Sequence, residues 1–116
     1  MVESSKYVAN WRAFARMCAV AAMAGRPVID KPNAVVVEVV FEFDRPKSHF
    51  NKKGLKSTVP IYHTGTPDVD KLLRALFDSM TGVIFHDDSQ VAVVRAVKLY
   101  GVIAKTTVVV TQKHKD

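Results

Sequence analysis

Two stretches of the chain repeat apolar residues at helical spacing. The first begins near Ser4 or Ser5, either of which can cap a helix, and stops before Gly25 and Pro27. Its apolar positions are Tyr7, Trp11, Phe14, Cys18 and Ala22. The second follows Pro67 and closes at Gly82, with apolar residues at Val69, Leu72, Leu73, Leu76, Phe77 and Met80. We expect these faces, including Trp11, Phe14 and the methionines, to form core.

Other stretches alternate apolar and polar residues or are rich in β-branched residues, as strands do. We expect strands at Ala34 to Phe43, Val83 to Phe85, Val91 to Leu99 and Thr106 to Thr111, with a polar turn from His86 to Gln90. The order is therefore α, β, α, β, β, β. This order predicts a small single α+β domain spanning residues 1–116, in which a mixed sheet packs with two helices.

Between residues 45 and 67 the regular pattern disappears, and we expect a long, mobile basic loop. The loop contains no carboxylate. Its five cationic residues are Arg45, Lys47, Lys52, Lys53 and Lys56. Aromatic and histidine side chains lie between them, namely His49, Phe50, Tyr62 and His63. Such a composition suits contacts with a phosphate backbone and stacking on bases. The alternative is a loop that only adds solubility.

Charge and cysteine content narrow the class of protein. The 116 residues include 17 Lys and Arg against 11 Asp and Glu, a net charge of +6, which favours nucleic acid first and an anionic membrane surface second. No apolar stretch approaches the ~20 residues of a membrane-spanning helix, and we expect no signal peptide. Cys18 is the single cysteine, which excludes a disulfide framework and a Cys-based zinc site and favours a reducing cytoplasm.

Four carboxylates occur in two short clusters, Asp68 with Asp70 and Asp87 with Asp88. Oxygen ligands of this kind suit Mg²⁺ or Mn²⁺. Asp68 and Asp70 can share an ion only if Asp68 lies before the first helical turn, because residues i and i+2 of a helix point in different directions. The alternatives are helix capping for the first cluster and turn chemistry for the second.

Arg74 follows Asp70 by one helical turn, and Asp78 follows Arg74 by another. These residues form either a solvated charge stripe or a cationic group that contacts a phosphate oxygen beside the acidic cluster. The four histidines, His49, His63, His86 and His114, lack the spacing of a zinc site and are interpreted as ordinary polar residues.

The segment from Pro67 to Asp78, followed by Gly82 to Val91, resembles the RusA family of Holliday-junction resolvases. That family has Asp-x-Asp at a helix start, a basic residue four positions on, and an Asp-Asp-x-Gln turn after the helix. The matching residues here are Asp68, Asp70, Arg74, Asp87, Asp88 and Gln90. The basic stretch from Arg45 to Phe50 is similar to a loop of many phage members.

The resemblance implies a homodimeric, Mg²⁺-dependent endodeoxyribonuclease of phage type that nicks branched DNA during recombination and repair, in a bacterial cytoplasm. It implies Asp68, Asp70 and Asp88 as metal ligands, with Arg74 in the place of the family's lysine and Lys71 where the family commonly has asparagine. Lys71 joins the five cations of the basic loop as an expected DNA contact. Two alternatives stay open: a non-catalytic DNA-binding domain with a degenerate acidic site, and a nuclease of broader specificity for flaps or forks.

Overall fold

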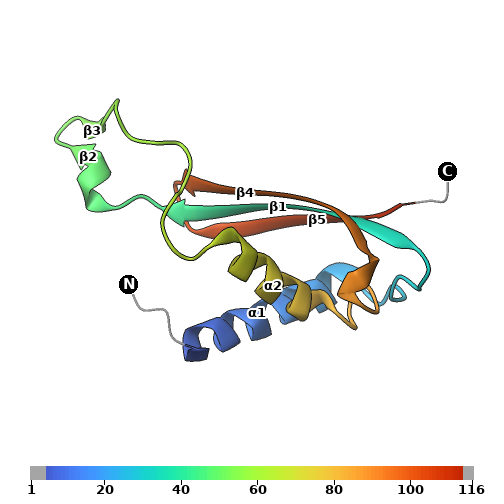
Figure 1. Cartoon of the computed structure of the whole chain (residues 1–116). Coiled ribbons are helices and arrows are strands. Elements are labelled where there is room, and N and C mark those ends of the chain that lie inside the picture. The colour runs from blue at the N-terminus through green and yellow to red at the C-terminus, as the bar shows by residue number, and fades with distance from the viewer. Residues whose placement is uncertain (1–4, 114–116) are drawn as a thin grey trace.

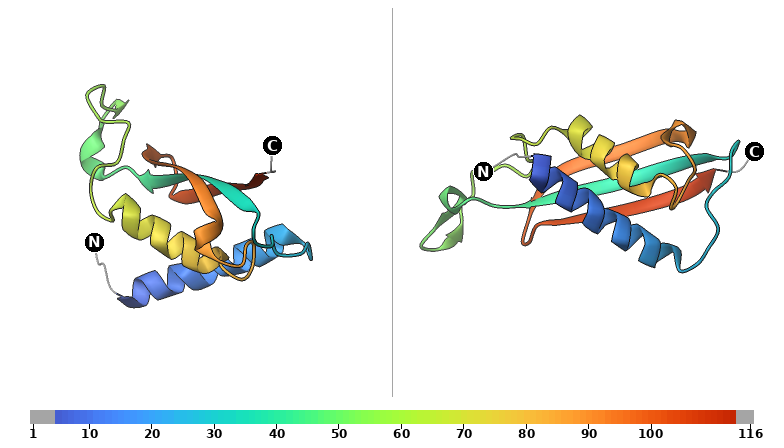
Figure 2. Two further views of the ribbon diagram at one scale, coloured as in Figure 1. Left: turned by 45° about the vertical axis from the view of Figure 1, so that its right-hand side comes forward. Right: turned by 90° about the horizontal axis from the view of Figure 1, so that it is seen from below.

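A mixed three-stranded sheet lies over two helices in the computed structural model, which describes residues 5–113 (Figure 1). The main elements, in chain order, are α1 (Ser5–Met23), β1 (Ala34–Asp44), α2 (Val69–Met80), β4 (Val91–Gly101) and β5 (Lys105–Lys113). The central strand β1 pairs with β4 in parallel and with β5 in antiparallel register. Both helices cover the same face of the sheet (Figure 2). The predicted α+β class, its mixed sheet and the order of its main elements are confirmed.

The core forms between the inner face of β1 and α2. Alternate β1 side chains, Val35, Val37, Val39 and Phe41, are at most 2% exposed and meet Leu76, Met80 and Phe85. Because β1 is the central strand and its inner face is covered by these residues, its inward side chains lose almost all contact with water. The helical spacing of α2 and the alternation of β1 therefore predict this core correctly, except for Val69, the first residue of α2, which is 40% exposed.

The first helix packs mainly on α2 rather than on the sheet. Trp11 packs against the core, but Phe14 and Met17 are 65% and 69% exposed, and Cys18 is also exposed. An apolar groove remains between α1 and β5. The prediction that Phe14, Cys18 and all the methionines belong to the core is wrong, because α1 packs mainly on α2 and leaves part of its apolar surface exposed.

The predicted strand from Val83 to Phe85 is also wrong, because these residues form a turn. Gly82 has a positive φ of 82°, and its N–H donates to the Phe85 carbonyl at 2.7 Å. Phe85 is fully buried and makes only isolated bridges, to Ile29 and Thr81. The chain must reverse between α2 and β4, which leaves too few residues for a strand.

The basic segment is more regular than predicted. A short 3-10 helix, η1 (Lys47–His49), leads into a hairpin in which β2 (Phe50–Asn51) pairs with β3 (Gly54–Leu55). Residues 45–60, here called the basic arm, project beyond the end of the sheet (Figure 1). A strand of two residues is too short to produce an alternating pattern, so the sequence does not reveal it. Within residues 5–113, neither helix is long and apolar enough to cross a membrane.

Candidate functional site

The start of α2 carries one of the two acidic clusters. Asp68 is the N-cap, with extended backbone angles, and Asp70 lies in the first turn. Asp68 therefore precedes the helix, as a shared ion site requires. Its side chain makes no capping hydrogen bond, which counts against the capping alternative. Both carboxylates are exposed, and among residues 5–113 neither forms an ion pair.

Strand β4 fixes the chain that leads into this cluster. The ammonium group of Lys98 donates to the carbonyls of Gly65 at 2.6 Å and Pro67 at 2.7 Å. The His63 N–H donates to the Lys98 carbonyl at 3.0 Å, and the Tyr100 N–H donates to the Ile61 carbonyl at 3.0 Å. These bonds hold the segment before α2 against β4, so the position of Asp68 is set by the sheet as well as by the helix.

A group of rings joins the basic arm to the same end of the sheet. His63 stacks on Phe43 with ring centroids 3.9 Å apart, and the Tyr100 ring meets His49 and His63 edge-on at 4.9 Å and 5.1 Å. Burial lowers the pKa of His63, and the charge of Lys98 lowers it further. The buried Nδ1 of His63 has no hydrogen-bond partner within the described chain. Burial and the charge of Lys98 thus both favour the neutral form of the His63 ring.

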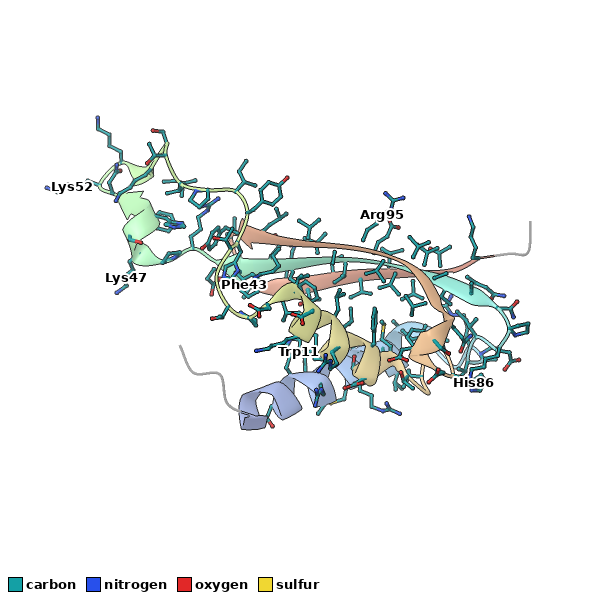
Figure 3. The ribbon with its side chains drawn as sticks, in the orientation of Figure 1. Trp11, Phe43, Lys47, Lys52, His86 and Arg95 are labelled. Atoms are coloured by element: carbon teal, nitrogen blue, oxygen red, sulfur yellow. The ribbon has the colours of Figure 1, made fainter. Side chains whose placement is uncertain are left out.

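Arg45 differs from the other predicted DNA-binding cations. Its guanidinium lies over the Tyr100 ring at 5.1 Å, donates to the Pro60 carbonyl at 2.8 Å and lies 3.3 Å from Nδ1 of His49. It is half-buried and holds the two ends of the arm together. The exposed cations of the arm are Lys47, Lys52, Lys53 and Lys56, and Figure 3 shows Lys47 and Lys52 pointing away from the sheet.

Lys71 and Arg74 are exposed on α2, close in sequence to the acidic pair. The charge stripe considered for Asp70, Arg74 and Asp78 does not form, because Asp78 pairs instead with Arg12 of α1 at 3.4 Å. Within residues 5–113, Arg74 makes no ion pair. Its guanidinium is therefore available to an anion that approaches the start of the helix.

The second acidic cluster belongs to a tight turn that includes the 3-10 helix η2 (Asp88–Gln90). Hydrogen bonds from the Ser89 side chain and from the Ser89 N–H, which lies 3.2 Å from Oδ2 of Asp87, lower the pKa of the Asp87 carboxyl. Lys31 lies 3.9 Å away and lowers it further. Asp87 thus fulfils the turn role considered for it, whereas the neighbouring Asp88 is exposed.

Gln90 organises this turn from inside. Its side-chain oxygen accepts from the N–H groups of His86 at 2.9 Å and Asp87 at 3.0 Å. Its amide nitrogen donates to the carbonyls of Ile29 at 3.1 Å and Asn33 at 3.0 Å. A buried side chain with four such bonds fixes the backbone that presents Asp88.

One chain does not bring all the predicted ligands together. Asp68 and Asp70 lie at the start of α2, whereas Asp88 follows its other end (Figure 1). Twelve residues of α-helix separate the two places, or about 18 Å. In the part of the chain that the structure describes, no group of three or more His, Cys, Asp or Glu is suited to hold a metal ion. The single chain therefore offers a pair of carboxylates, and Asp88 is remote from it.

Lys98 and His63 contribute to the site without having been singled out for it. One signal was present for Lys98, because it falls on the inward side of β4, in register with the buried Phe41. A lysine at an inward position of a strand usually has a specific partner. From the sequence, His63 is recognised only as one of the rings of the basic loop, and His114 lies outside the described residues.

An exposed carboxylate pair beside cationic side chains, on a small α+β scaffold with a basic arm, is an arrangement that suits action on the phosphodiesters of a nucleic acid. The family model of the endodeoxyribonuclease RusA matches residues 1–111. The chain belongs to this family of endodeoxyribonucleases, which resolve Holliday junctions and generally depend on a divalent metal. Neither the curated proteins nor the solved structures give a significant match.

Proposed function

We propose that this chain is a Mg²⁺-dependent resolvase that nicks four-way and other branched DNA in pairs, as a homodimer. The observation that carries the proposal is the pair of exposed carboxylates at the start of α2, at the same end of the molecule as the basic arm. Family membership supports branched DNA as the substrate. The positions of the exposed side chains support the assignment of those that meet it.

Asp68 and Asp70 fit a hard cation. Carboxylate oxygens are its preferred donors, and Mg²⁺ is commonly held by one or two carboxylates together with water and substrate phosphate. Neither side chain has an ion-pair partner within residues 5–113, so neither has to give one up. When bound, Mg²⁺ or Mn²⁺ supplies a polarised phosphate and an activated water.

The surrounding side chains bind and orient the DNA. Arg74 and Lys71 stabilise the negative charge that grows on the phosphate oxygens during hydrolysis, Arg74 through its planar fork of donors. Arginine holds its charge permanently, so Arg74 acts electrostatically and not as a proton donor. The exposed lysines of the basic arm grip phosphates that flank the cut. Arg45 holds the arm in place through its hydrogen bond to Pro60 and its contact with the Tyr100 ring.

We assign Asp88 to the acidic site of a second copy. Within one chain it is separated from Asp70 by the length of α2, and the Gln90 bonds hold it there. A two-fold dimer can bring opposite ends of two chains together, and it repeats each contact twice. Two equivalent sites would then face a nearly symmetric junction, which is the geometric basis for paired incisions.

Cleavage of a labelled four-way junction tests the activity, with linear duplex beside it and with Mg²⁺ or EDTA present. We expect nicks only on the junction and only with Mg²⁺. Asp70→Asn should abolish cutting and preserve binding, because a ligand charge is lost while repulsion of phosphate falls. Asp78→Asn, on the same helix but paired with Arg12, is the matched control and should cut normally. Binding without cutting under every metal condition would favour the non-catalytic DNA-binding module.

A mixing experiment tests the assignment of Asp88. Asp70→Asn and Asp88→Asn should each be inactive alone. Co-refolded together, they should regain about a quarter of the wild-type nicking, because half of the dimers are mixed and each of these has one complete site. A mixture that stays inactive while both variants dimerise would contradict a shared site.

A further inference from the structure

The basic arm exposes two large apolar side chains at its far end. Phe50 and Leu55 are 48% and 52% exposed and are directly opposed across the β2–β3 pair. Between them the turn carries Lys52 and Lys53, and Asn51 closes it by accepting from the Lys53 N–H at 2.9 Å. Phe50 and Leu55 lie outside the core cluster, so packing within the chain does not explain them.

The arm is built to hold these side chains in one place. The Lys56 N–H donates to the His49 carbonyl at 2.9 Å, which closes the arm beyond its hairpin. Arg45 bonds to the Pro60 carbonyl and covers the Tyr100 ring, which also meets His49. These contacts restrict the movement of Phe50 and Leu55 before a partner binds. Less conformational entropy is therefore lost on binding.

The chemistry of the arm selects its partner. Lysines around an apolar pair suit a molecule with anionic edges and flat apolar faces, which describes nucleic acid. In continuous duplex the base faces are covered by stacking. At a branch point the last base pair of each arm can lose a stacking neighbour, and apolar side chains can pack on the uncovered face.

We propose that the basic arm recognises the branch point: Phe50 and Leu55 pack on base faces uncovered at the junction centre, while Lys52 and Lys53 bind the phosphates around it. This inference rests on the proposed function and adds the device that selects branched over linear DNA. The lysines attract either form of DNA. Phe50 and Leu55 contact exposed base faces only at the branch point.

Binding measured in EDTA tests the inference apart from catalysis. The probe is a four-way junction with 2-aminopurine at the branch point, and linear duplex of the same sequence is the comparison. Wild-type protein should bind the junction more tightly and change the fluorescence of the probe. Phe50→Ala combined with Leu55→Ala should weaken junction binding about ten-fold, leave duplex binding unchanged and remove the fluorescence change.

Two further variants keep the test decisive. Met17→Ala combined with Val20→Ala removes two apolar side chains of α1 that are 69% and 56% exposed and should change nothing. Phe50→Tyr keeps an aromatic face and should retain junction preference even if the double variant folds poorly. Unchanged junction preference in a folded double variant would overturn the role of the arm and leave the proposed function standing. Wild-type protein that binds junction and duplex equally would overturn both.

Discussion

The ammonium group of Lys98 donates to the backbone carbonyl of Pro67 at 2.7 Å, so β4 fixes the residue directly before Asp68. The same ammonium group also donates to the Gly65 carbonyl. Of the hydrogen bonds between β4 and residues 61–67, the one to Pro67 is nearest in sequence to Asp68 and Asp70. The candidate site is thus positioned by a strand that contributes no ligand to it.

Replacing Lys98 with Met should lower junction nicking about ten-fold at saturating Mg²⁺, because a loosened Pro67 leaves the carboxylates less well oriented. The free energy of unfolding should fall by about 1–2 kcal/mol through the lost hydrogen bonds. Lys113→Met, an exposed lysine at the end of β5, is the control and should do neither. Nicking assays and urea unfolding measure both effects, and wild-type nicking by Lys98→Met would refute the positioning role.

Gln90→Ala should destabilise the protein by about 2–4 kcal/mol, because it leaves two backbone N–H groups and two carbonyls of a buried turn without partners. It should also lower nicking, since Asp88 loses its fixed backbone. Gln112→Ala on β5 serves as the control. Urea unfolding checks the first effect, and a loss below about 0.5 kcal/mol would show that the turn holds without Gln90.

Phe85→Ala and Phe14→Ala should differ sharply although both residues occur in apolar patterns. Phe85 is fully buried, and its truncation should cost about 3–5 kcal/mol through lost burial and the cavity left behind. Phe14 is 65% exposed, and its truncation should stay within about 0.5 kcal/mol. Equal losses would mean that α1 packs more closely on the core than the structure has it.

Stability should fall as the pH drops below about 6.5, the ordinary pKa of histidine. The pKa of His63 is lowered in the folded chain, so the unfolded chain binds its proton first. The contribution of His63 is complete above the unfolded pKa and is lost as the pH falls through the folded pKa. His63→Phe, which keeps a ring against Phe43, should flatten this dependence in urea unfolding between pH 7.5 and 5. If His63→Phe leaves the pH dependence of the free energy of unfolding unchanged, that dependence comes from other titratable groups.

Replacing Lys52 and Lys53 with Gln should weaken binding to junction and duplex alike and should flatten the dependence of log K on log salt by about 1.8, two phosphate contacts' worth. Lys105→Gln with Lys113→Gln changes the net charge equally but removes lysines of β5, outside the arm. This control should leave the slope in place. Identical slopes for the two double variants would remove the arm from the DNA contact surface.

Local spacing alone was enough to predict α2, β1 and the acidic pair. The helical period of α2 and the alternation of β1 each describe a face that packs within the same chain, so pattern and structure agree. Asp68 and Asp70 are close in sequence, and only the helix start had to be located to place them. The family motif contains the same residues, with Arg74 and the Asp87 to Gln90 turn at matching positions.

The tertiary structure decided everything that depends on distance between separate elements. The apolar period of α1 could not say that α2 would be its main partner, so Phe14 was wrongly predicted as core. Asp88 shares a motif with Asp70, yet the length of α2 lies between them. Lys98 reaches Pro67 only because β4 runs parallel to β1 and returns beside the start of α2. Sequence patterns report local geometry, and these relationships arise only when the elements pack.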